Sequence, residues 1–553
     1  MSRRRLRRSA TLLPLLLILL PVGVAAADGA ASPGETFDKQ LLQLRVVIAA
    51  LTAALLGIGF WLDRRSEGRY RRVRGALLAI FAVTAFCANY NFFLWPHRGG
   101  VHGHDMFHYY LGAKYFPELG YYDLYRCTVA ADTESRPGSW KGGAVRDLRS
   151  NRVLPVAEIM PDRPRCDGLF SPQRWGEFSD DVRWFHGRLP GPRWDRVLVD
   201  LGYNPSPVWT LIGRPVAEAV SVDGRTLRFA AKLDLLILVA MFGVVGWCFG
   251  FPIMCLTVIF WATNPLSRYQ WIGDSLLRYP WLATSLTGIC LLYRSRDAAA
   301  GACLATATLL RLFPGFQIAT YAVHQGREAW RRRQWSTRTS RFAAGAAGMS
   351  LVLILLSLGV TQRGFDAYGS FGQNITRHAQ LVGSNSVGLR PLLSFSSEDA
   401  EARHQSPDRF VAQRLGQERK RDTFASRRLA YAGILAVFGL LLWRTLGRCQ
   451  AWEAAALGVV PALLLPKMSC YYLAAMVVMA LLSARRPRIA IATLFALVAW
   501  GIGSLYFFGE ELQYVMASVV ALALVFYVLI EMQFEARHDL GSPIPSPRPR
   551  SAS

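Results

Sequence analysis

The segment from His102 to Tyr125, with the sequence HGHDMFHYYLGAKYFPELGYYDLY, holds the residue types best suited to chemistry. Its 24 residues include one early carboxylate (Asp105), three histidines, six tyrosines and Lys114. A carboxylate can take a proton from a hydroxyl group within hydrogen-bond reach, and a tyrosine offers a flat ring with one polar end. The segment follows an apolar run that ends near Trp95. A polar, aromatic-rich segment beside a membrane helix could therefore handle a water-soluble group.

The spacing within this segment predicts a helix that presents Asp105, Tyr109 and Gly112 on one face, because residues three or four apart are neighbours on a helix. Structural explanations stay open as well. Asp105 could be a helix cap or a first-turn acid, and the tyrosines could form an interfacial aromatic belt. Glu118 and Asp123 are rival carboxylates in the same segment.

Two histidines of the segment, His104 and His108, are spaced one helical turn apart and could bind a metal ion together. The neighbouring sequence has no second acid in the manner of an HExxH arrangement, which argues against a metal site. The nine cysteines include no CxxC pair. Cys127 and Cys166 fall in one long loop that the topology places outside the cytoplasm, where an oxidising compartment would permit a disulfide.

The composition is that of a membrane protein. Of 553 residues, 52% are hydrophobic and only 18% are charged, below the roughly one quarter of soluble domains. Several apolar runs reach or approach the roughly 20 residues that cross a bilayer. The net charge of +25 is concentrated in short links between apolar runs, which is typical of cytoplasmic loops and anionic lipid contact rather than nucleic-acid binding.

These runs predict an all-α polytopic membrane protein with about 12–14 transmembrane helices and a large extracytoplasmic loop. The basic links agree with one topology, in which Arg327–Arg333 and Arg485–Arg488 lie inside. The resulting segments are a signal peptide or signal anchor (1–27), N-terminal transmembrane helices (28–96), the large extracytoplasmic loop (97–228), a transmembrane core (229–360), a second extracytoplasmic loop (361–428), C-terminal transmembrane helices (429–535) and a disordered cytoplasmic tail (536–553).

Four polar stretches fall on the extracytoplasmic side of this topology, which suggests a cavity open to that side. Arg311, in LLRLFPG, interrupts an apolar pair that is broken at Pro314. A charge at membrane depth is costly and normally faces a cavity or a partner, although an arginine near a helix end can also reach the interface. The four stretches are His102–Tyr125, Tyr203–Pro207, Gly383–Arg390 and Pro466–Tyr472.

The motifs DMFHYY, LY, YNPSP, LRLFP, SNSVGLR and PKMSCYY follow one another within residues 75–485. Their order resembles the glycosyltransferase-C superfamily, and more narrowly the polyprenyl-phosphate-mannose-dependent mannosyltransferases of glycosyltransferase family 87. This sequence departs from the family pattern in four places. Asn204 stands for a proline, Arg311 stands for a lysine, Ser384–Ser386 matches only in part, and a tryptophan is missing near Ser469.

The resemblance implies a glycosyltransferase-C-like helical bundle in a bacterial inner membrane, with its active site facing the extracytoplasmic side. It implies inverting transfer of a hexose such as mannose from a polyprenyl-phosphate donor to a glycan or glycolipid acceptor, with Asp105 as general base. It also implies that the enzyme needs no metal and no other cofactor. A leaving phosphate needs fixed cations or donors, and the candidates are Arg311, Lys467, Arg390 and His378. The candidates for sugar and acceptor binding are Tyr109, Tyr110, Lys114, Tyr125, Asn204 and Asn385.

Two other functions stay open. A transporter or lipid flippase would carry inverted repeats with broken helices in matching halves, whereas the sequence has one broken pair, near residues 298–324. A ligase that moves whole lipid-linked glycans would be expected to carry its main polar loop late in the chain, and here the longest such loop comes early.

Overall fold

The computed structural model describes most of the chain. The predicted signal segment (1–27) and the predicted tail (536–553) lie outside the described residues. The described ranges are 33–63, 70–94, 100–136, 140, 143–159, 166–189, 191–267, 269–396, 409–506 and 510–534. The chain forms two units, residues 1–40 and residues 41–553, and all of the elements below except the start of the first helix belong to the second.

Seven helices in the described part of the chain are long and apolar enough to cross a membrane. The protein is therefore an α-helical polytopic membrane protein, as predicted. These helices are α2 (Pro33–Asp63), α3 (Arg71–Asn89), α13 (Thr226–Phe249), α19 (Thr337–Thr361), α24 (Arg428–Leu446), α28 (Pro487–Tyr506) and α29 (Glu510–Glu531).

Five further apolar segments are shorter, with 10–17 residues each. A helix of about 14 residues is only about 21 Å long, less than the roughly 30 Å of a bilayer core, so such a helix must be covered by protein where it ends. The predicted 12–14 spans require these segments to enter the bilayer as well. They are α14 (Phe251–Thr263), α16 (Pro280–Tyr293), α17 (Asp297–Leu310), α25 with α26 (Ala451–Ala456 and Val459–Leu464), and η4 with α27 (Cys470–Val477 and Val478–Ser483).

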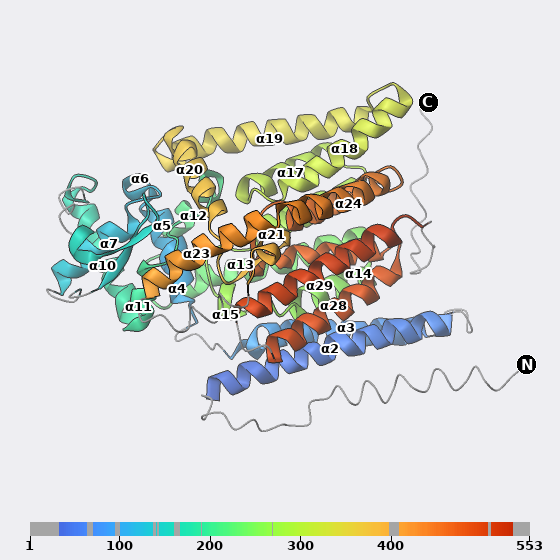
Figure 1. The fold of residues 1–553 in the computed structure, drawn as a ribbon, viewed down its shortest axis with the longest axis horizontal. Helices are drawn as coiled ribbons and strands as arrows, with labels where there is room; N and C mark the ends of the chain where they lie inside the picture. Colours follow the sequence, from blue (N-terminus) through green and yellow to red (C-terminus); the bar gives the residue numbers. More distant parts are fainter. Residues whose placement is uncertain are drawn as a thin grey trace, which may run out of the picture. The chain divides into compact units, whose positions relative to one another are not determined.

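Helices α17 and α19 pack backbone against backbone and lie side by side in Figure 1. A Cβ atom added at Gly345 would lie 1.9 Å from the carbonyl oxygen of Ala298, and one added at Gly301 would lie 2.1 Å from that of Phe342. Small residues allow this close approach between membrane helices.

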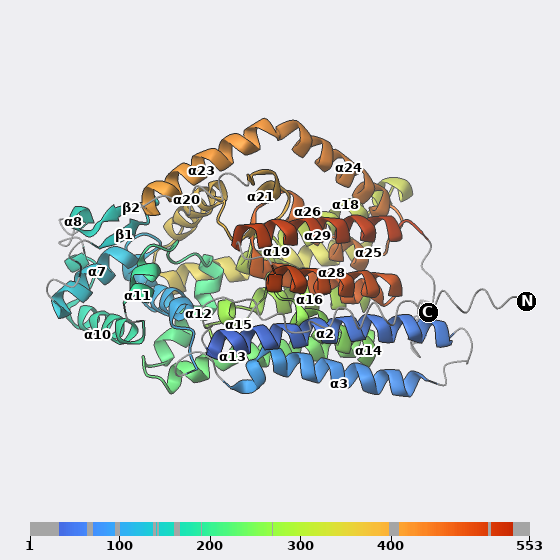
Figure 2. The same cartoon turned by 60° about the horizontal axis from the view of Figure 1, so that its bottom comes forward.

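The predicted extracytoplasmic loop folds into a small helical domain. Figures 1 and 2 show its elements gathered at one end of the long helices. Cys127 and Cys166 form the disulfide that the sequence permitted. The elements are α4 (Gly103–Met106), η2 (Phe107–Leu111), α5 (Gly112–Lys114), α6 (Phe116–Leu119), α7 (Leu124–Ser135), β1 (Ala144–Asp147), β2 (Arg152–Pro155), α8 (Val156–Ile159), α10 (Pro172–Arg188), α11 (Pro192–Leu198) and α12 (Pro207–Ala219).

The second polar segment, residues 361–428, is also largely helical where it is described. A two-residue strand in it, β3 (Ser386–Val387), pairs antiparallel with β4 (Met468–Ser469), with Ser386 opposite Ser469. This pairing brings two of the predicted polar stretches together. The remaining elements are η1 (Asn91–Phe93), α15 (Tyr269–Ile272), α18 (Gly315–Arg332), α20 (Asp366–Gln380), α21 (Leu389–Leu393) and α23 (Arg409–Ser426).

Candidate active site

The segment that carries Asp105 is helical but not a regular α-helix. His102 caps α4, because its Nδ1 accepts a hydrogen bond from the backbone N–H of Asp105 at 3.0 Å. The chain then passes through the π-helical turn η2, a feature that is frequent at functional sites. Asp105 and Tyr109 both contact Arg278, so the two residues share a face, as the spacing predicted.

The carboxylate of Asp105 forms an ion pair with a buried arginine that the sequence did not single out. Arg278 Nε lies 3.2 Å from Asp105 Oδ2, and the two side chains are 5% and 15% exposed. The backbone N–H groups of Arg278 and Tyr279 donate to the carboxylate of Asp234, at 2.7 and 3.0 Å. Asp234, on the apolar helix α13, thus holds the short segment before α16 that presents Arg278.

The electrostatics around Asp105 keep it ionised. Burial alone would raise the pKa of its carboxyl group, but the Arg278 guanidinium and then His102 oppose this effect, and the pKa of Asp105 lies below its usual value. A carboxylate that stays ionised can accept a proton, which is the state that a general base requires. The purely structural role of a first-turn acid also fits the position of Asp105 in α4.

Arg311 is the second arginine that contacts Tyr109. Arg311 Nη2 donates a hydrogen bond to Tyr109 Oη at 2.6 Å. The guanidinium carbon of Arg278 lies 4.4 Å from the centre of the Tyr109 ring and 5.1 Å from that of Tyr471, and Arg311 also approaches the ring of Tyr472. Two guanidinium groups and three tyrosines therefore form one connected cluster of contacts, which Arg278 links to Asp105.

Arg311 is positioned by the break between α17 and α18, where its backbone is extended. Its Nε is buried and has no hydrogen-bond partner among the described residues, and an unmatched buried donor of this kind favours an anionic acceptor. The YNPSP motif lies beside this break, because Ser206 Oγ donates to the carbonyl of Leu309 at 2.5 Å. In the same motif, Asn204 Oδ1 accepts from Asn374 Nδ2 at 3.1 Å.

A small cavity lies between the two arginines and the tyrosines. Its free space of about 10 Å³ suffices for about one water molecule, so a sugar phosphate could enter only if the surrounding side chains moved. The residues that line it are Ile272, Arg278, Tyr279, Trp281, Arg311, Tyr471 and Tyr472.

Three of the predicted sugar-binding or acceptor-binding residues have partners elsewhere. These partners lie within the helical domain or at its border and hold its elements together. Tyr110 donates to the carbonyl of Val220 at 2.5 Å, Lys114 pairs with Asp181 at 2.7 Å, and Tyr125 Oη lies 2.6 Å from His108 Nε2.

The other predicted phosphate-binding residues lie near β3 and β4, where Lys467 and Arg390 form a second cationic group beside His378. Burial lowers the pKa of Lys467 to about 8, and the neighbouring Arg390 and Lys420 add to this effect. Burial followed by the charge of Lys467 lowers the pKa of His378 to about 4, so this imidazole is neutral near pH 7. Arg390 Nε is buried without a hydrogen-bond partner among the described residues.

Asn385 directly precedes β3, and its contact with the β4 side of the pair is made by its backbone carbonyl. The backbone N–H of Cys470 donates to the carbonyl of Asn385 at 2.9 Å. Lys467 precedes Tyr471 by four residues, so the two Cα atoms lie at most about 14 Å apart. Lys467 therefore lies within a short stretch of chain of Tyr471, whose ring contacts Arg278.

The rival carboxylates have ion-pair partners in the helical domain. Glu118 Oε1 lies 2.9 Å from Arg174 Nε, and Asp123 Oδ2 lies 3.0 Å from Arg149 Nη2. Asp105 is thus the carboxylate of its segment that pairs with an arginine lining the cavity.

Arg278 is the main residue that the sequence analysis missed. It stands in LLRYPW, two residues before the proline that begins α16. A charge at the start of an apolar run was the one available signal, whereas Arg311 was singled out by a different one, a charge inside an apolar pair that is broken at Pro314. Its pairing with Asp105 depends on tertiary contacts between distant segments.

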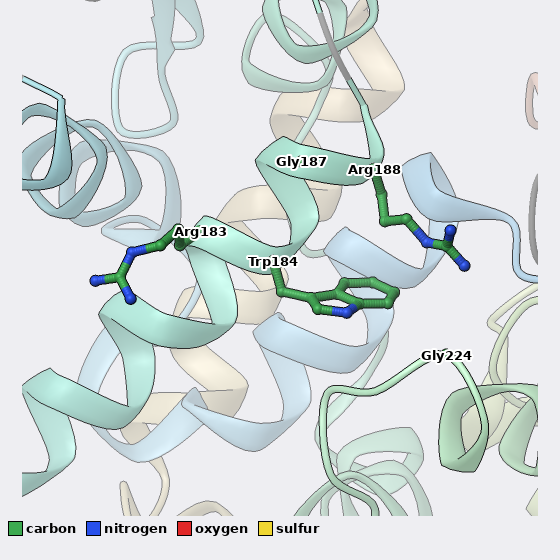
Figure 3. Close-up of a pocket in the computed structure, with 5 residues that line it drawn as sticks. All are labelled: Arg183, Trp184, Gly187, Arg188 and Gly224. Atoms are coloured by element: carbon green, nitrogen blue, oxygen red, sulfur yellow. The ribbon is translucent and has the colours of Figure 1, made fainter.

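Another pocket, with about 420 Å³ of free space, lies on α10. Figure 3 shows the Trp184 ring between the helix and the loop at Gly224, with Arg183 pointing away from that loop. The guanidinium carbon of Arg188 lies 5.2 Å from the centre of the Trp184 ring. Its lining of Arg183, Trp184, Gly187, Arg188 and Gly224 contains no carboxylate and none of the predicted site residues.

No family profile, curated protein or solved structure matches this chain. The site combines an ionised carboxylate, two neighbouring guanidinium groups and several tyrosine hydroxyls where apolar helices meet a polar domain. Such a set can remove a proton from a hydroxyl group and stabilise a nearby phosphate.

Proposed function

We propose that this protein is a membrane glycosyltransferase that transfers a hexose, for example mannose, from a polyprenyl-phosphate sugar to an extracytoplasmic glycan or glycolipid. The observation that supports this function most is the ion pair between Asp105 and the buried Arg278, next to Arg311. The order of the sequence motifs, which resembles that of glycosyltransferase family 87, also supports this function.

In the proposed reaction, the acceptor hydroxyl gives its proton to Asp105. The hydroxyl oxygen forms a bond to the anomeric carbon of the donor, and the bond from that carbon to the phosphate oxygen breaks with its electron pair. Polyprenyl phosphate leaves with an additional negative charge, which Arg311 and Arg278 would stabilise. One displacement inverts the anomeric centre, and the proposed step uses no metal.

Arg278 would have two roles in this reaction. It keeps Asp105 ionised before the acceptor binds, and it would turn toward the phosphate as Asp105 becomes protonated. Such an exchange of partners is available because Arg278 also lies over the rings of Tyr109 and Tyr471. Lys467, Arg390 and His378 would bind a more distant part of the anionic donor, and Asn204 and Asn385 would contact sugar or acceptor.

The ends of the broken helix pair support the extracytoplasmic side. Helix α17 runs from Asp297 to Leu310, so Arg311 lies at the end opposite to Arg294 and Arg296. Helix α18 likewise places Arg331 and Arg332 in its last turn, away from Arg311. Because short basic links are cytoplasmic, the site would face the compartment where nucleotide sugars are absent and a lipid-linked donor is needed.

Incubation of the purified full-length protein with a set of polyprenyl-phosphate sugars and membrane-derived glycolipids tests this function. We expect one donor to be consumed and a glycosylated acceptor to form. Donor binding or translocation across a vesicle membrane without product would favour the transporter or flippase. Transfer of a whole glycan from a lipid carrier would favour the ligase, and either of these results would contradict the proposal.

A further inference from the structure

We propose that His104, His108 and Asp200 form a binding site for a divalent transition-metal ion of the Zn²⁺ class, which fastens the Asp105 segment to the loop before α12. One ligand atom of each residue lies within 4.8 Å of the other two. His104 Nε2 and Asp200 Oδ2 are only 2.9 Å apart. This site is separate from the arginine-lined cavity, and its role is structural.

The distances suit a small metal ion. Tetrahedral zinc with metal–ligand bonds of about 2.0–2.1 Å has its ligand atoms roughly 3.3 Å apart. The separations here, from 2.9 Å to at most 4.8 Å, bracket that value, so small side-chain rotations would bring all three atoms to bonding distance. Two histidines one helical turn apart and a carboxylate are common zinc ligands.

The hydrogen bonds outside the three ligand atoms provide a second, independent argument. His108 Nδ1 lies 2.9 Å from the carbonyl oxygen of His104, so the Nδ1–H tautomer directs the Nε2 lone pair away from the backbone, where a metal could replace the Tyr125 hydroxyl as its partner. Metal-binding histidines usually donate their other ring N–H in this way. Asp200 Oδ1 accepts the backbone N–H of Leu201 at 2.8 Å, which leaves Oδ2 for the ion.

A fourth oxygen donor and an access route are also present. Tyr125 Oη lies 2.6 Å from His108 Nε2 and would rotate its proton away or leave the fourth position to water. His108 is buried, whereas the side chains of His104 and Asp200 are 35% and 46% exposed. An ion could therefore reach the site from the aqueous side without unfolding the domain.

The binding test uses Co²⁺ alone, in the absence of any sugar donor. Purified full-length protein is treated with a chelator, dialysed and titrated with Co²⁺, whose visible absorption reports tetrahedral coordination. We expect one equivalent to bind and to be displaced by Zn²⁺. Because no transfer is measured, this result is independent of the proposed function.

The variants Asp200→Asn and His104→Gln should weaken Co²⁺ binding by at least about tenfold. Both residues are partly exposed, so these variants should fold, and an unchanged gel-filtration profile checks this. His186→Ala is the matched control, because His186 Nδ1 pairs with Asp132 at 2.7 Å outside this group. Wild-type binding no tighter than that of Asp200→Asn, or an equal loss in His186→Ala, would overturn the proposal.

Discussion

At the scale of single residues, the proposed function depends on the buried ion pair between Asp105 and Arg278. Removing one partner of such a pair leaves an uncompensated charge, which typically costs about 3–5 kcal/mol. The sequence identified Asp105, Tyr109 and Arg311 because their types and spacing are unusual beside apolar runs. It did not identify Arg278, because an arginine at the start of an apolar run is more often an interfacial residue. The pairing of Arg278 with Asp105 is seen only in the folded structure, because the two residues are far apart in the sequence.

Replacement of Arg278 by glutamine should change the pH dependence of transfer. Arg278 lowers the pKa of Asp105, and a base must be unprotonated, so activity is lost as the pH falls through that pKa. Without the guanidinium the pKa rises, and the acid limb of kcat/KM should move to higher pH. Arg149→Gln, which removes the partner of the rival Asp123, should leave the limb in place. An unmoved limb in Arg278→Gln would show that this pair does not govern the base.

Replacement of Arg311 by glutamine should lower kcat more than it raises KM. A cation that stabilises charge developing on the leaving phosphate acts mainly in the transition state, and losing such a contact typically costs about 10²–10³ in kcat. Steady-state kinetics with a saturating donor separates the two constants. A rise in KM with an unchanged kcat would assign Arg311 to ground-state binding only.

At the scale of helices and strands, the sequence predicted the break at Arg311–Pro314 because a proline and a charge interrupt an apolar run. The two-residue pairing of β3 with β4 could not be predicted, since so short a strand has no periodicity. The π-helical turn η2 also leaves no mark in the sequence. Both features are set by tertiary packing around the site.

The α17–α19 contact offers a stability test. Gly345→Leu would place side-chain atoms against the backbone of Ala298, and overpacking of this kind costs at least about 1–3 kcal/mol. Gly359→Leu is the matched control on the same helix, because a Cβ there meets nothing within 4 Å. We expect the thermal unfolding temperature in detergent to fall only for Gly345→Leu. Equal unfolding temperatures would contradict the close packing.

The disulfide should stabilise the helical domain. It closes a loop with a sequence separation of 39, for which the chain-entropy relation gives about 4 kcal/mol. Denaturant unfolding of the Cys127→Ala/Cys166→Ala double variant should show a loss of this size, whereas Cys303→Ala, which alters a free cysteine, should not. A double variant as stable as the wild-type protein would mean that the disulfide adds nothing.

At the scale of the whole protein, composition and periodicity were sufficient to predict an α-helical membrane protein. The number of transmembrane spans was harder to predict, because seven helices are long enough to cross a membrane and five apolar segments are shorter. Short helices that end inside a protein cannot be distinguished by length alone from spans. The topology instead depends on the basic links, which follow a general charge rule.

Impermeant maleimide labelling of intact cells tests that topology. Ser221→Cys, just before α13, should react from outside, whereas Ser336→Cys, in the basic link before α19, should react only after the cells are opened. Both residues are exposed, and the unsubstituted protein supplies the background from the native cysteines. Reaction of Ser336→Cys from outside would place the candidate site on the cytoplasmic side.

The most direct measurement is the transfer rate of Asp105→Asn, with the polyprenyl-phosphate sugar that the wild-type protein consumes. General-base catalysis contributes about 10²–10⁴-fold, so we predict a loss of that size with intact folding and membrane insertion. Asp195→Asn, at an exposed position in α11, should retain the wild-type rate. Turnover by Asp105→Asn equal to that of the wild-type protein would contradict the account.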